Sequence, residues 1–193
     1  MEDCTKGGND LIKVTTLAAG AYIGGDAGVA MFMNAKGGND EIAVGTASGY
    51  LGGDAGYTMR NRTTGGNDKI TVTTATGYIG GDAGYDMKNN AKGGDDTITI
   101  TSITGSQKYI GGDAGYTITG GTGGNDSISV AGTVNASYVA GDAGADMTNA
   151  TGGNDTLTAA LVNGYGTVAG DAGRHMLGAS KGGNDSLAVG EVS

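Results

Sequence analysis

Proline and tryptophan are absent from the 193 residues, and the chain has one cysteine, one histidine and one phenylalanine. A single thiol excludes an internal disulfide framework. The scarcity of large aromatic residues excludes a conventional core, so any core must be thin and filled with Ile, Val, Leu, Met and Ala. No apolar run approaches the roughly 20 residues of a membrane span. The first residues, MEDCTKGGND, lack the basic and apolar regions of a secretory signal. This predicts either a cytoplasmic protein or export by a route that does not read the N-terminus.

Glycine and aspartate are what the chain has in excess. It contains 42 glycines, about three times the usual share. The net charge is −9, and 13 of the 17 aspartates occur in two recurring turns, GGND and GGDAG. We expect this acidity to form a stripe that favours cations and argues against nucleic acid as a partner.

The two turns recur in interleaved series that share one period. The GGND-type aspartates, spaced 28–30 residues apart, are Asp10, Asp40, Asp68, Asp96, Asp126, Asp155 and Asp185. The GGDAG-type aspartates, spaced 28–31 residues apart, are Asp26, Asp54, Asp82, Asp113, Asp142 and Asp171. This predicts an all-β fold, a β-solenoid of six to seven coils of about 29 residues with the two turns at opposed corners. A narrower coil of about 14 residues, which would stack GGND on GGDAG, is the alternative.

Apolar residues alternate after each GGND, as in a half-buried strand. The expected inward pairs are Ile12/Val14, Ile42/Val44, Ile70/Val72, Ile98/Ile100, Ile128/Val130, Leu157/Ala159 and Leu187/Val189. A second strand is expected at Tyr22-Ile23 and its equivalents, and a third set of equivalent positions is Met31, Met59, Met87, Ile118, Met147 and Met176. We predict one repeat domain over residues 7–190, with tails at 1–6 and 191–193.

Stacking would place each corner aspartate about 4.8 Å from its counterpart in the next coil. Two like charges at that distance repel by about 1 kcal/mol in bulk water and by more in a shielded corner. Calcium would remove this repulsion, because it takes six to eight oxygen ligands, including carboxylates and backbone carbonyls. All 13 turn aspartates are therefore candidate Ca²⁺ ligands. The alternative is metal-free turn chemistry, since Asn-Asp and Gly-Asp form good turns by themselves.

The stretches TGGNDKITV, KGGNDLIKV, TGGNDSISV and TGGNDTLTA resemble the repeats-in-toxin (hemolysin-type calcium-binding) repeat, G-G-x-G-x-D-x-U-x. The resemblance implies calcium bound between the coils of a parallel β-roll. It also implies type I secretion, with folding triggered by extracellular calcium. The chain departs from that family in its period of 28–31 residues, and the complete nonapeptide does not occur.

The repeats run from Gly7 to Gly190 and leave no room for a capping unit. Because an open solenoid end presents unpaired strand edges, we expect either end-to-end stacking into filaments or a piece of a longer repeat protein. His175 and Cys4 lie at opposite ends of the sequence, which argues against a catalytic triad and against an enzyme.

Two surface features leave other binding functions open. Small outward residues on the GGND strand (Lys13, Ala43, Thr71, Thr99, Ser129, Thr158, Ala188) allow an ice-binding solenoid as an alternative. Two tyrosine ladders could stabilise the coil or bind carbohydrate. The sequence as a whole predicts a secreted, calcium-binding structural solenoid at the bacterial surface, as a filament, surface-layer, matrix or adhesin module. Its expected partners are itself and cell-surface polysaccharide.

Overall fold

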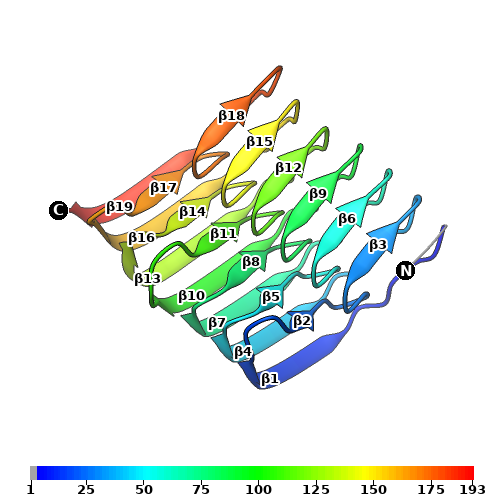
Figure 1. The fold of residues 1–193 in the computed structure, drawn as a ribbon, viewed down its shortest axis with the longest axis horizontal. Coiled ribbons are helices and arrows are strands. Elements are labelled where there is room, and N and C mark those ends of the chain that lie inside the picture. The colour runs from blue at the N-terminus through cyan, green and yellow to red at the C-terminus, as the bar shows by residue number, and fades with distance from the viewer. Residues whose placement is uncertain (1–3) are drawn as a thin grey trace.

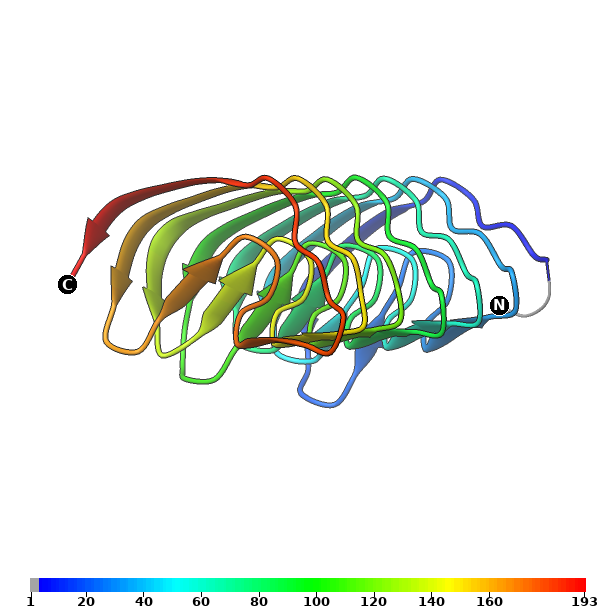
Figure 2. The same cartoon turned by 90° about the horizontal axis from the view of Figure 1, so that it is seen from above.

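The computed structural model describes residues 4–193, which form a β-solenoid of about six turns with a period of about 29 residues (Figure 1). The larger coil is therefore confirmed, and the 14-residue alternative is wrong. All of the regular structure is strand, and the described residues include no helix long and apolar enough to cross a membrane. Viewed from above, the coils follow one another along a single axis (Figure 2).

Each full coil contributes one strand to each of three parallel sheets. The long-strand sheet contains, in order, β1 (Leu11–Leu17), β4 (Glu41–Ala47), β7 (Lys69–Ala75), β10 (Thr97–Ile103), β13 (Ser127–Asn135), β16 (Thr156–Asn163) and β19 (Ser186–Val192). The tyrosine sheet contains β2 (Tyr22–Ile23), β5 (Tyr50–Leu51), β8 (Tyr78–Gly80), β11 (Tyr109–Gly111), β14 (Tyr138–Ala140) and β17 (Thr167–Ala169). The methionine sheet contains β3 (Ala30–Phe32), β6 (Thr58–Arg60), β9 (Asp86–Lys88), β12 (Thr117–Thr119), β15 (Asp146–Thr148) and β18 (His175–Leu177).

The predicted inward pairs form the aliphatic core beneath the long-strand and tyrosine sheets. Pairing in register stacks Ile42 on Ile70 and Ile70 on Ile98, and all three side chains are fully buried. Alternation with a period of two sends every second residue of these strands inward, so one slip of register would expose the whole ladder. In the end coils the same positions are more open, and Leu187 is 43% exposed.

The methionine positions form a second, separate core. They lie on the third strand of each coil, where Met31, Met59, Met87, Ile118 and Met147 are fully buried. Alanines from the neighbouring corner and from the segment that returns to GGND complete this cluster. Each coil therefore encloses two small hydrophobic cores.

Each methionine strand ends in a tight turn, here called the tip turn, whose backbone is left-handed. The φ angles are 63° at Asn61, 62° at Arg62, 56° at Asn89 and 62° at Asn90. Asparagine tolerates this conformation better than most residues. The tip turns lie in a row along one edge of the solenoid (Figure 1).

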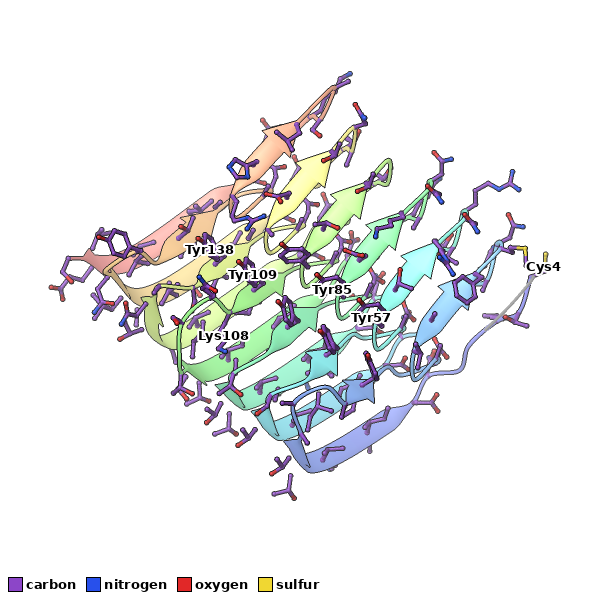
Figure 3. All side chains as sticks on the ribbon, viewed as in Figure 1. Cys4, Tyr57, Tyr85, Lys108, Tyr109 and Tyr138 are labelled. Atoms are coloured by element: carbon purple, nitrogen blue, oxygen red, sulfur yellow. The ribbon has the colours of Figure 1, made fainter. Side chains whose placement is uncertain are left out.

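The two predicted tyrosine ladders are present and interlock. Tyr57 stacks on Tyr85 with ring centroids 5.0 Å apart, and Tyr109 stacks on Tyr138 at the same distance (Figure 3). Rings of one ladder also meet rings of the other edge-to-face, as Tyr78 meets Tyr85 at 5.1 Å. Such pairs add about 0.5–1.5 kcal/mol each beyond burial, so the ladders stabilise this corner.

The extra residues of the longer coils lie in one turn and within one strand. One insertion occupies the turn between β10 and β11, and a register shift between Val130 and Thr133 absorbs another within β13. Of the predicted N-terminal tail, residues 1–3 lie outside the described residues. Lys6 forms a parallel bridge with Lys36, and β19 extends to Val192.

Candidate metal centre

The two turn types meet inside the coil. The sequence led us to expect them at opposed corners, and this was wrong. GGND precedes the long strand and GGDAG joins the tyrosine and methionine strands, yet carboxylate oxygens from both turns come within 4.8 Å of one another. The contact between the turns lies between the two hydrophobic clusters of each coil, the aliphatic core and the methionine core.

Each meeting point is a triad with one GGDAG aspartate and two GGND aspartates from successive coils. The five triads are Asp10–Asp26–Asp40, Asp40–Asp54–Asp68, Asp68–Asp82–Asp96, Asp96–Asp113–Asp126 and Asp126–Asp142–Asp155. Every inner GGND aspartate belongs to two triads. The triads therefore form one continuous row along the solenoid axis, which we call the aspartate row.

One oxygen of each GGND carboxylate is engaged by the backbone. Asp68 Oδ1 accepts a hydrogen bond from the amide of Asp40 at 2.6 Å, and Asp96 Oδ1 accepts one from the amide of Asp68 at the same distance. The bond repeats along the row, so each aspartate holds the turn of the preceding coil. Charge-assisted bonds of this kind are among the stronger hydrogen bonds in proteins.

The GGDAG carboxylates also bind backbone amides. Asp54 Oδ2 accepts from the amide of Gly66 at 2.8 Å, and Asp82 Oδ2 accepts from that of Gly94 at 3.0 Å. Both donors are the second glycine of a GGND turn. These glycine amides are functional groups that the sequence analysis did not identify, and the invariance of the GG pair was the available signal.

The second oxygen of most of these carboxylates is buried and has no hydrogen-bond partner. These oxygens are Asp40 Oδ2, Asp54 Oδ1, Asp68 Oδ2, Asp82 Oδ1, Asp96 Oδ2, Asp126 Oδ2, Asp142 Oδ2 and Asp155 Oδ2. All eight side chains are at most 2% exposed. A buried acceptor without a partner costs about 1–3 kcal/mol, and more when it is charged. Eight such atoms in one row could act as ligands of a cation.

Glycine at the GGDAG corner is required by this geometry. A Cβ atom on Gly53 would overlap both Asp68 Oδ2 and the carbonyl oxygen of Gly81. The same overlap recurs at Gly81 and Gly112, each time with a carboxylate and a carbonyl of the next coil. Backbone carbonyls therefore lie beside the unpartnered carboxylate oxygens.

Burial and mutual repulsion hold the carboxyl groups back from ionising. Burial raises the pKa of Asp54 to about 9, with a further increase from the charge of Asp68. Burial likewise raises the pKa of Asp68 to about 8 and that of Asp155 to about 7. At the centre of the row, burial and neighbouring carboxylates raise the pKa of Asp96 and Asp113 well above the usual value.

A divalent cation fits this donor set. The available ligands are hard oxygens, three carboxylates per triad with carbonyls nearby, as Ca²⁺ and Mg²⁺ prefer. Soft ligands do not occur in the five triads. Each coil supplies two carboxylates to the row, so one divalent ion per coil would neutralise it.

Eleven of the 13 predicted ligands belong to the five triads. Asp171 and Asp185 continue the row and keep its hydrogen bonds to backbone amides, but they belong to none of the triads. Asp86 and Asp146, which lie outside the two recurring turns, are not part of the row. Asp86 binds Lys88 and Thr117, and Asp146 binds Arg174 and His175.

The expected acidic stripe is not on the surface. At the middle of the row Asp54, Asp82 and Asp113 are fully buried, so the carboxylates face one another inside the coil. A second ladder does lie outside, where the turn asparagines donate and accept in series, as between Asn39 and Asn67 at 3.0 Å. This outer ladder is closed by its own hydrogen bonds and carries little charge.

Comparisons with protein-family models, with curated proteins and with solved structures gave no match for the chain. The likeness to the repeats-in-toxin repeat therefore stays a resemblance between short motifs.

Proposed function

We propose that the chain is a calcium-stabilised β-solenoid with a structural role outside the cell. The observation that carries this proposal is the row of buried carboxylate oxygens without hydrogen-bond partners, which face one another in triads. Hydrogen bonds within and between the turns account for both oxygens of Asp26 and Asp113 and for one oxygen of most of the other carboxylates. They do not account for the eight buried oxygens that have no partner.

Calcium is the divalent ion that we favour. Each triad combines carboxylates from two successive coils with glycine carbonyls, and calcium accepts such mixed and irregular oxygen sets more readily than magnesium does. Because the ligands come from different coils, the site exists only in the folded chain. Binding free energy is therefore folding free energy.

The charge balance gives a stoichiometry. One divalent ion per triad corresponds to five ions per chain. Adjacent ions would share a GGND carboxylate, so each carboxylate between them also screens their mutual repulsion.

The test compares two neighbouring aspartates in one turn. Asp96 is buried and belongs to two triads, whereas Asp95 is exposed and occupies a position that is asparagine in the other GGND turns. Asp96→Asn keeps an acceptor for the amide of Asp68 but removes a charged ligand. We expect it to weaken calcium binding at least about tenfold and to lower the number of bound ions. Asp95→Asn should leave both quantities unchanged.

Calcium binding is measured by isothermal titration calorimetry after chelator treatment, and bound ions are counted by native mass spectrometry. In chelator, Asp96→Asn should also raise the melting temperature, because it removes a buried charge that nothing neutralises. A wild-type chain that binds no calcium, or an Asp96→Asn variant that behaves like Asp95→Asn, would overturn the proposal.

The structural role that we propose is assembly with other copies of the chain, in a filament, surface layer, matrix or adhesin module, with cell-surface polysaccharide as a further partner. It is supported by the edge strands β1 and β19, which leave one side of their backbone unpaired among the described residues. We assign no catalytic activity to the chain. Export by type I secretion follows from the motif resemblance. Negative-stain microscopy with and without calcium tests assembly, and only monodisperse particles in both samples would exclude it.

A further inference from the structure

The exterior of the solenoid carries an excess of positive charge once the aspartate row is set aside. Thirteen of the 20 acidic residues are turn aspartates, which leaves seven acidic residues against 11 lysines and arginines. When cations neutralise the 13 turn aspartates, the rest of the chain carries a surplus of four positive charges. The net charge of −9 therefore misrepresents the surface that a partner meets.

Much of this surplus lies on one edge of the molecule. We define the basic edge as Lys36, Arg60, Arg62, Lys88 and Lys92. Arg60 pairs in register with Lys88 across β6 and β9, Arg62 lies in the adjoining tip turn, and parallel bridges link Lys36 to Lys92 through one intervening residue. Neighbouring coils are about 4.8 Å apart, so the five residues lie within three successive coils, on the methionine strand, its tip turn and the segment that follows.

The cations of the basic edge are largely without counter-charges. Within residues 4–193, Lys88 pairs with Asp86, and no ion pair involves the other four residues. Lys36, Arg60, Arg62 and Lys92 are all exposed.

The basic edge also has shape and hydrogen-bonding groups. Two shallow hollows adjoin it and share three of their lining residues, namely Met33, Asn61 and Asn89. Arg60 lines one hollow, where its guanidinium lies 4.3 Å above the ring of Phe32. Arg62 lines the other hollow. Asparagine amides both donate and accept hydrogen bonds, as sugar hydroxyls require. The left-handed tip turn sets the backbone from which these side chains project.

We propose that the basic edge binds a carboxylated or sulfated polysaccharide. Arginine forks match the planar or tetrahedral oxygens of such groups, and the amides beside them match hydroxyls. Single-stranded nucleic acid is the less suitable polyanion, because its binding sites use exposed aromatic rings as base platforms. Phe32 is already covered by Arg60, and the tyrosines of the two ladders pack against one another. The exposed Tyr165 lies in the turn between β16 and β17, outside the basic edge. The inference rests on the proposed extracellular role, but not on which ion fills the aspartate row.

The test uses heparin and alginate as polyanionic probes, neutral dextran, and single-stranded poly(dT). The edge variant is Arg60→Gln with Arg62→Asn. Asparagine occupies the equivalent turn position in the coils on both sides, at Asn34 and Asn90, so this change preserves the turn. The control variant, Lys13→Gln with Lys69→Gln, removes two positive charges from the long-strand sheet. Affinities are measured by biolayer interferometry in calcium and again in chelator at a pH where circular dichroism shows the fold intact.

We expect the folded wild-type chain to bind heparin or alginate and not dextran, with affinity falling as salt rises. The edge variant should bind about tenfold more weakly, and the control variant about as well as the wild type. Tighter binding to poly(dT) than to both polysaccharides, equal losses in the two variants, or no binding to either polysaccharide would overturn the inference. Heparin binding that persists in chelator would leave this inference standing even if calorimetry detected no calcium binding, so the two proposals can fail separately.

Discussion

Removing divalent ions should invert the usual pH dependence of stability in this protein. A carboxyl whose pKa is raised in the folded state stabilises the fold fully below its unfolded pKa of 3.8, where both states hold the proton. That stability is lost as the pH rises through the folded pKa, because the unfolded chain releases its proton first. Asp40, Asp155, Asp68 and Asp54 have folded pKa values of about 6, 7, 8 and 9. The loss should therefore extend from pH 4 to about pH 9.

The magnitude is large compared with the stability of a domain. For Asp155 the rise from 3.8 to about 7 is roughly three pKa units, an upper bound of about 4 kcal/mol at about 1.36 kcal/mol per unit, and solvent screening near the end of the row reduces it to about 2 kcal/mol. This one residue is a substantial part of the 5–15 kcal/mol that holds a typical domain folded. In a chain of this size about 2 kcal/mol corresponds to about 6 °C in melting temperature. Several such residues together should leave the metal-free chain unfolded or barely folded at pH 8.

Circular dichroism melts between pH 5 and 8.5 in chelator measure this effect. We expect the melting temperature to fall steadily with pH and the β-sheet signal to be weak at the upper end. Added calcium should restore the signal at pH 8 and have less effect at pH 5, where protons compete for the same oxygens. In chelator, a melting temperature that is the same at pH 5 and pH 8, or higher at pH 8, would refute the inference that the aspartate row carries unneutralised charge when no metal is present.

Two further substitutions test the corner and the core separately. Gly53→Ala should lower both calcium affinity and thermal stability, because the added methyl overlaps a carboxylate and a carbonyl, whereas Gly28→Ala meets no atom within 4 Å and should be tolerated in the same calorimetric assay. Ile98→Ala should reduce the free energy of unfolding by about 2–5 kcal/mol in urea titrations with calcium present. Thr99→Ala on the exposed face should change it by less than about 0.5 kcal/mol; equal effects would show that the register is wrong.

The sequence was sufficient for the parts of the fold that repeat. A period near 29 residues and strict alternation after GGND predicted the long strands, and pairs such as Ile70/Val72 are buried as expected. The methionine positions were visible as a repeat but not as a separate core. Their strands are only three residues long, too short to show a period.

The arrangement of the site could not be predicted in the same way. The sequence gives the separation of Asp54 and Asp68 along the chain, but not that the GGND and GGDAG turns meet inside the coil. That meeting is a contact between separate segments, which the alternation within a single strand does not report. For the same reason, the sequence predicted a row of carboxylates but did not show that this row is buried.

Burial of the aspartate row reconciles a net charge of −9 with a surplus of positive charge on the rest of the chain. In the calcium-bound state that we propose, each added coil brings two more carboxylates and about one more divalent ion into the row, so the interior stays neutral at any length. The exterior is then free to carry whatever charge its partner requires. In this chain the free cations gather at Arg60 and Arg62, away from the row. If the row instead faced solvent, lengthening the solenoid would add negative charge to its surface with every coil, and neither assembly with like copies nor binding of a polyanion would be favourable.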